Sequence, residues 1–399
     1  MNNTKKLTSQ WYNALVQSCG LESQTFQLVK GLLSTEDSLT IWKIMDRIPP
    51  ESINQIDDRY EFGSNSFSTH YGAVIKNLYP QDSSQSAMQD LLGDSYISWA
   101  NYTTLSSSAN PSPSPTEPLV DIFKYKKAQF QNWCLENGQS QETIVAGIGI
   151  LSQVDFISAA AAKWKVASEK KIFAYSATAQ DIKNAIDCGQ AKTVDFNSKT
   201  QSFDTSSSWA SGKVSGEYGF FRGSVSQPLQ QFSQDIQQQG VQLVVKFSRV
   251  ATLTASQLST KNTLESDLSK YEPWYDSKVI QTAYQQNDNN LWKRTPPTWE
   301  DTFGPDGKLK NLSVALVVVD GISSTMTTTA SVSQSDRESF KTAASAGYWP
   351  FFKTQGQGGW STDITFNDNG SISIKSSSNV GNPYVLGVLV SPCGKIFGG

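Results

Sequence analysis

The sequence predicts an α+β fold, in which a helical N-terminal part precedes an antiparallel β-rich part (a sheet or a sandwich). Over most of residues 1–170, apolar residues recur every three or four positions, which is the spacing of one helix face. From about residue 171 the period changes to two, as in strands with one buried face. Near the end, alternating residues flank Asp368-Asn369-Gly370, a strong hairpin signal. We therefore expect a helical layer joined to a sheet that carries a few inserted helices.

The first helices are expected within residues 1–104, which we assign to a helical N-terminal region. Leu7, Trp11 and Leu15 share one face of the first predicted helix. Residues 86–102 show the same spacing of apolar side chains. We expect helices throughout this region and no strand.

A linker and a second helical region are expected next. Residues 105–118, LSSSANPSPSPTEP, alternate Pro with Ser, a composition typical of an extended linker, although a packed surface loop fits it equally. Residues 119–170 return to helical spacing, and we expect them to pack on the first region. Gly147 and Gly149 lie in VAGIGIL, which lacks the third glycine of a dinucleotide-binding loop. We expect these glycines to allow close helix packing instead.

Residues 171–399 form the predicted antiparallel β-rich domain. The most apolar segment, LSVALVVVDGI at 312–322, is the expected central strand, and it runs into a segment dominated by Ser and Thr. Helices are expected to interrupt the strands at 227–240 and 257–269. The alternation over 360–374 predicts the hairpin.

The composition argues against several classes of function. Charged residues make up 17% of the chain, against about 25% in an average soluble domain, and the formal net charge is −3. This balance lacks the basic stripe that nucleic-acid binding needs. A surface of uncharged hydroxyls and amides causes little long-range repulsion between copies, which favours self-association. We therefore expect the chain itself as a partner, with a lipid membrane or a carbohydrate as alternatives.

The sequence shows no targeting or membrane-spanning pattern. No apolar run of membrane-spanning length occurs, and the first residues lack the apolar stretch of a signal peptide. The expected location is cytoplasmic by default, with release by a non-classical route left open.

Catalytic and metal-binding patterns are scarce. His70 is the one histidine in the chain, and the four cysteines are scattered, so we expect no metal and no cofactor. Asp57 and Asp58 with Glu61 fit a loose magnesium-binding pattern, but a short run of acids arises easily by chance and we expect a solvated helix end instead. Asp320, directly after the buried strand, is a weak catalytic candidate, and its alternative role is in an Asp-Gly turn.

Clustered aromatic residues are the candidate membrane or partner contacts. Exposed aromatics serve sugar stacking, membrane insertion or protein contacts, whereas buried ones belong to the core. The candidates are Trp209, Tyr218, Phe220, Phe221, Trp274, Tyr275, Tyr348, Trp349, Phe351 and Phe352.

These patterns favour a non-enzymatic, self-associating protein. Its most specific form is a membrane-acting, pore-forming type that inserts an amphipathic Ser/Thr-rich β-hairpin drawn from residues 205–226 and 323–335. One alternative is a self-assembling structural protein or ligand-binding module that never enters a membrane. A second alternative is a carboxylate-dependent hydrolase, because a catalytic acid pair is defined in space rather than in sequence.

Overall fold

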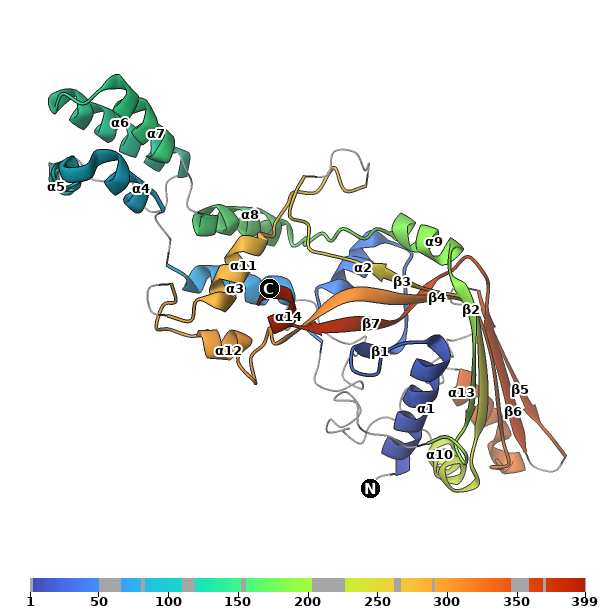
Figure 1. Ribbon diagram of the computed structural model, residues 1–399. Coiled ribbons are helices and arrows are strands. Elements are labelled where there is room, and N and C mark those ends of the chain that lie inside the picture. Colours follow the sequence, from blue (N-terminus) through green and yellow to red (C-terminus); the bar gives the residue numbers. More distant parts are fainter. Residues whose placement is uncertain are drawn as a thin grey trace.

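A computed structural model shows a long antiparallel sheet with helices packed around it and a helical unit set apart from it (Figure 1). The predicted α+β class is confirmed. The structure describes residues 3–49, 66–79, 83–109, 119–151, 156–202, 227–261, 267–288, 291–345, 359–368 and 371–398.

The strands fall mainly in the C-terminal half. They are β1 (Phe26–Ser34), β2 (Gln190–Asn197), β3 (Gln242–Thr254), β4 (Asn311–Thr328), β5 (Trp360–Phe366), β6 (Ile372–Ser378) and β7 (Tyr384–Pro392).

The helices surround the sheet or form the separate unit. They are α1 (Asn3–Cys19), α2 (Ser38–Met45), α3 (Phe67–Asn77), α4 (Ser83–Leu92), α5 (Tyr96–Ala109), α6 (Leu119–Glu136), α7 (Gln141–Leu151), α8 (Phe156–Lys170), α9 (Ala179–Asp187), α10 (Gln227–Gln239), α11 (Ser277–Gln285), α12 (Trp299–Phe303), α13 (Arg337–Ser345) and α14 (Cys393–Phe397), with short 3-10 turns at η1 (Gly93–Ser95) and η2 (Gln334–Asp336).

The sheet forks along its central strand. β4 has 18 residues and pairs with β3 along most of its length. On its other edge, residues 311–319 pair with β7, and residues 323–328 pair with β6. β1 extends the β7 branch, and β5 extends the β6 branch. The sequence LSVALVVVDGI therefore is central, as predicted, and the Ser/Thr segment continues the same strand.

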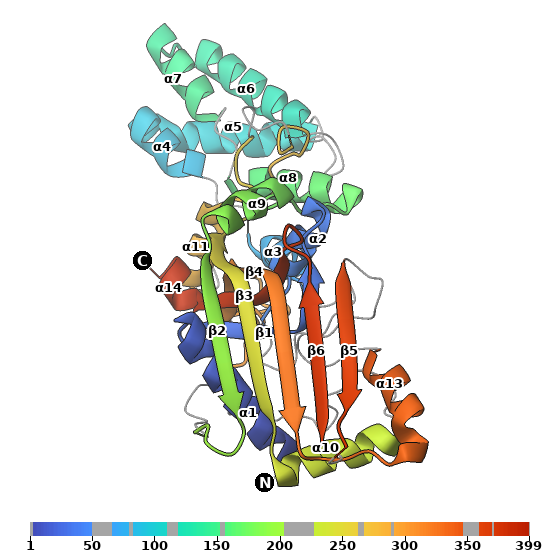
Figure 2. The same ribbon diagram turned by 90° about the vertical axis from the view of Figure 1, so that its right-hand side faces the viewer.

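The two halves of β4 differ in how they are covered. Residues 315–322 are all buried, which explains the continuous apolar sequence of this half. Residues 323–328 alternate between exposed or half-buried and buried positions, as in a sheet with one solvated face. Figure 2 shows the five strands β2, β3, β4, β6 and β5 side by side, with no helix of the described residues in front of their lower part.

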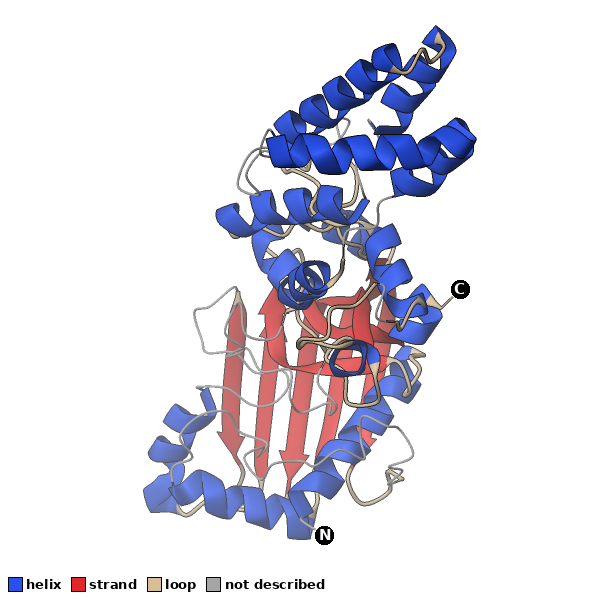
Figure 3. Ribbon diagram, turned by 90° about the vertical axis from the view of Figure 1, so that its left-hand side faces the viewer, coloured by secondary structure: helices blue, strands red, loops and turns tan. Residues whose placement is uncertain are grey.

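The opposite face of these strands is apolar. Trp11 of α1 packs edge-to-face on Phe196 of β2, with ring centroids 5.7 Å apart. Phe340 of α13 contacts both Phe232 of α10, at 4.7 Å, and Phe366 of β5, at 5.9 Å. Figure 3 shows helices along two sides of this face.

The separate unit consists of α4 to α7 around its own apolar core (Figure 1). Its buried members include Met88, Trp99, Phe130 and Trp133. The next helix, α8, packs in the main core instead, where Ile157 is buried. The helices expected over 119–170 are therefore divided between two cores.

Three local expectations were wrong. β1 lies in the region expected to be helical, because its apolar residues Phe26 and Leu28 pair with β7. The expected linker begins inside α5, which continues to Ala109; residues 110–118 lie outside the described residues. The helix expected over 257–269 is not found in the described part of that segment. The predicted hairpin is confirmed, with Phe366 opposite Ile372.

Candidate functional site: a polar sheet face below a fork

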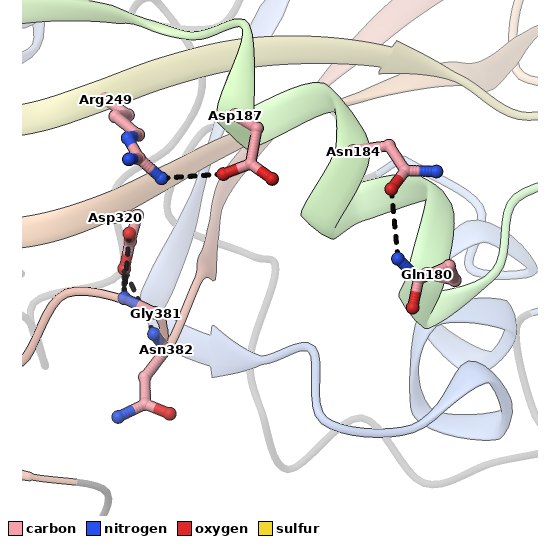
Figure 4. A network of polar contacts seen from close by, with 7 residues as sticks. All are labelled: Gln180, Asn184, Asp187, Arg249, Asp320, Gly381 and Asn382. Atoms are coloured by element: carbon pink, nitrogen blue, oxygen red, sulfur yellow. Dashed lines mark hydrogen bonds and ion pairs between the residues drawn. The ribbon is translucent and has the colours of Figure 1, made fainter.

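The fork of the sheet is held by a buried carboxylate. Asp320 has no exposed surface, and both its oxygens accept a hydrogen bond from the Gly381 backbone N–H at 3.0 Å. Its Oδ1 also accepts from the Asn382 backbone N–H at 3.1 Å. Gly321 and Gly381 have φ angles of +59° and +95°, a backbone region that favours glycine. Asp320 thus holds the turn between β6 and β7 at the point along β4 where the paired strand changes from β7 to β6 (Figure 4).

A surface ion pair lies beside the fork. Arg249 of β3 is directly opposite Asp320 in the strand register. Its guanidinium lies 2.8 Å from Oδ1 of Asp187, at the end of α9 (Figure 4). Both partners of this pair are solvent-accessible, so it contributes little to stability but ties α9 to the sheet. Asp320 is therefore part of a structural joint, and it lies within β4 rather than in the Asp-Gly turn expected after the strand.

Below the fork, five strands present one polar face, which we call the polar face. The strand registers align its residues in three rows of five across β2, β3, β4, β6 and β5. The first row is Thr193, Lys246, Ser323, Ser377 and Ser361; the second is Asp195, Val244, Thr325, Lys375 and Asp363; the third is Asn197, Gln242, Thr327, Ser373 and Thr365.

None of these residues is buried, and hydroxyl or amide side chains fill most positions. Neighbouring side chains can bridge, as in the Oγ–Oγ contact of 2.9 Å between Ser361 and Ser377. The intervening residues of the same strands, such as Leu243, Val245 and Met326, are fully buried. The side chains of one sheet thus separate into a mainly apolar inner face, which also holds the buried Ser324 and Ser376, and a solvent-accessible outer face.

The charges of the polar face cancel. It carries Lys246 and Lys375 against Asp195 and Asp363, all four exposed. Lys375 and Asp363 are opposite each other in the register of β6 and β5, an arrangement that stabilises cross-strand pairs. Because β5 is an edge strand, the charge of Asp363 also discourages edge-to-edge pairing.

A second buried carboxylate lies among the helices. Asp46, at the end of α2, accepts hydrogen bonds from the Ser68 backbone N–H at 2.9 Å, the Ser68 hydroxyl at 2.6 Å and the Tyr175 hydroxyl at 3.0 Å. Its removal from water raises its pKa to about 6, although these donors oppose that rise. Asp46 also lines a pocket, together with Lys43 and Lys171. These contacts join α2, α3 and the segment before α9. Asp46 therefore cross-links three parts of the core.

Two of the aromatic residues proposed as surface contacts are core residues. Trp274 is fully buried and Tyr275 nearly so, within a cluster that includes Phe67, Tyr71 and Tyr175. They are not accessible to a membrane or partner in this structure. The other candidates, Trp209, Tyr218, Phe220, Phe221, Tyr348, Trp349, Phe351 and Phe352, lie outside the described residues.

The described structure does not join the remaining catalytic and metal candidates into a cluster of metal-binding side chains. Burial lowers the pKa of His70, with a further effect of Lys308, and its Nε2 has no hydrogen-bond partner in the described part of the chain. The described residues contain no group of three or more His, Cys, Asp and Glu side chains that could hold a metal ion. The Asp57–Glu61 pattern lies outside them.

The helices give one finding about membranes. Within the described ranges, no helix alone is long and apolar enough to span a bilayer; α7 and α8 meet the length and composition criteria only as a pair bent by 43°.

Sequence reasoning did not identify the polar face as a whole. Its signal was present in the alternation of Ser and Thr over 323–327, 361–365 and 373–377. The missing information was the register, which alone places these three segments next to β2 and β3. Comparison of the chain with family models, curated proteins and solved structures gives no match.

Proposed function

We propose that this chain is a non-catalytic protein that acts by associating with copies of itself through the polar face. The observation that carries the proposal is the grid of three polar rows over five strands. A sheet with one solvated face is common in antiparallel folds. This face combines an even, hydroxyl-rich surface with cancelling charges, so a second copy meets little electrostatic repulsion as it approaches.

The alternative of a carboxylate-dependent hydrolase has weaker support. Both oxygens of Asp320 face backbone N–H donors of the turn that they hold, rather than a cleft. A general acid or base must be within hydrogen-bond reach of its substrate, which the buried Asp320 is not.

The membrane-acting form of the proposal carries an energetic requirement. Residues 323–327 of the candidate hairpin pair with β3 on one side, and residues 323–328 pair with β6 on the other. Their insertion into a bilayer requires both ladders to separate and to re-form as a closed barrel, because lipid satisfies no backbone group. Association in water requires no such rearrangement, so it is the form that the contacts favour.

Size measurement tests the proposal. We expect static light scattering to show a mass that rises from monomer to a discrete oligomer with concentration, without liposomes. Release of an encapsulated dye from liposomes, together with a monomer in buffer, would favour the membrane form instead. A monomer that releases no dye would contradict both forms.

A further inference from the structure

The arrangement of charges on the polar face allows a specific pairing of two copies. We propose that two copies stack their polar faces about a two-fold axis that runs between β3 and β4, parallel to these strands. The inference rests on the proposed function, and it adds the orientation of the partner and the residues that select it. The partner is a second copy of this chain.

The axis position follows from the register. A two-fold rotation about this line places β2 over the partner's β6, and β3 over the partner's β4, while each row stays over itself. Asp195 of the second row then faces Lys375 of the other copy, and Lys375 faces its Asp195. Two reciprocal ion pairs form because an isologous interface uses each contact twice.

The remaining positions of the overlap are compatible with this pairing. Lys246 faces Ser323, and Val244 faces Thr325, so no charge lies directly opposite a like charge; the Lys246 side chains of the two copies are diagonal neighbours, one strand apart across the axis. Asn197 and Gln242 of the third row face the hydroxyls of Ser373 and Thr327. Asp363 belongs to β5, which lies outside the overlap of the four strands.

Other symmetric stackings are less favourable. An axis in the face but perpendicular to the strands, through the second row, places Lys375 over its own copy in the partner. An axis between β6 and β5 pairs Lys375 with Asp363, but it overlaps only those two strands. The axis between β3 and β4 combines reciprocal ion pairs with a wide overlap.

The size of the overlap sets the expected strength. At a strand spacing of about 4.8 Å and about 3.4 Å per residue, four strands and three rows cover roughly 400 Å² on each copy. Interfaces of this size lie at the lower end of the range of interface areas and are weak or transient. We therefore expect a dimer that dissociates on dilution and weakens in high salt, because the ion pairs are solvent-accessible.

Charge reversal provides the test. With Asp195→Lys, a lysine faces Lys375 of the other copy at both contacts. With Lys375→Asp, an aspartate faces Asp195 of the other copy at both contacts. We expect each variant to dimerise at least about tenfold more weakly than the wild type in sedimentation equilibrium. Lys246→Asp reverses a charge on the same face opposite a serine, and it should dimerise like the wild type.

Mixing the two variants distinguishes the interface from misfolding. A chain with Asp195→Lys and a chain with Lys375→Asp carry opposite charges at both contacts, so their mixture should form heterodimers more strongly than either variant forms homodimers. The double variant in one chain should regain the homodimer. Recovery of the dimer in either experiment requires the variant chains to be folded.

Each outcome decides between distinct conclusions. A wild-type dimer whose reversals behave like Lys246→Asp would overturn this orientation and leave the proposed self-association with a different arrangement of the two copies. Reversals that weaken the dimer without recovery in the mixture would also overturn it. A wild-type monomer at all concentrations would overturn the proposed function and this inference together.

Discussion

At the scale of single residues, two buried carboxylates have structural roles. Asp46 lies in a helical core with a pKa raised to about 6, and it is only 2% exposed. Asp320 is fully buried but faces backbone N–H groups at the sheet fork. At Asp46, burial penalises the ionised form more than the hydrogen-bond donors stabilise it, so its pKa rises.

We predict that Asp46 makes the folded chain less stable as pH rises. Its pKa is higher in the folded chain than the ordinary value of 3.8, so its contribution to stability is fully present below that value and is lost as pH rises through about 6. The full difference is about 3 kcal/mol. Asp46→Asn should remove this dependence because it removes the titrating carboxyl. The contacts can remain, since the amide can accept from Tyr175 and donate to the Ser68 hydroxyl.

Urea unfolding between about pH 4 and pH 7 measures this effect. The wild type should lose stability over this interval relative to the Asp46→Asn variant. Asp94→Asn, a change at an exposed residue, should follow the wild type. Parallel pH profiles for the wild type and Asp46→Asn would contradict the prediction.

Asp320 is predicted to be a stability residue. Asp320→Ala leaves the backbone N–H groups of Gly381 and Asn382 without their acceptor, so the free energy of unfolding should fall by about 2–4 kcal/mol. Asp320→Asn keeps one oxygen and should lose less. Equilibrium denaturation compares the two, and equal losses would show that the acceptor is not what matters.

At the scale of secondary structure, sequence patterns identified elements whose surroundings are local. α10 lies within the helix predicted over 227–240, and β5 and β6 form the predicted hairpin. β1 was not predicted because it is a strand only by pairing with β7, which lies about 350 positions later in the sequence. The polar face was missed for the same reason, since its rows exist only once the register is set.

Gly147 and Gly149 provide a matched test of helix packing. A Cβ atom on Gly147 would overlap the ring of Phe130 in α6, whereas nothing lies within 4 Å of a Cβ on Gly149. We expect Gly147→Ala to lower the thermal midpoint of the helical unit. Gly149→Ala should leave it unchanged or raise it, because alanine favours a helix over glycine by about 1 kcal/mol. Circular dichroism measures both, and a lower midpoint for Gly149→Ala would contradict the packing argument.

At the scale of the whole molecule, the two apolar cores predict two units of unfolding. The unit α4–α7 buries its side chains against one another, and the main core joins the sheet to the other helices. Each core can open without exposing the other, so stability need not be uniform along the chain. Hydrogen exchange should therefore show one protection level shared by α6 and α7, and another shared by β3 and β4. Gly147→Ala should increase exchange in α6 and α7 while leaving β3 and β4 unchanged. Equal increases in both sets would mean that the chain unfolds as one cooperative body, in which a defect at one helix contact is felt across the entire sheet.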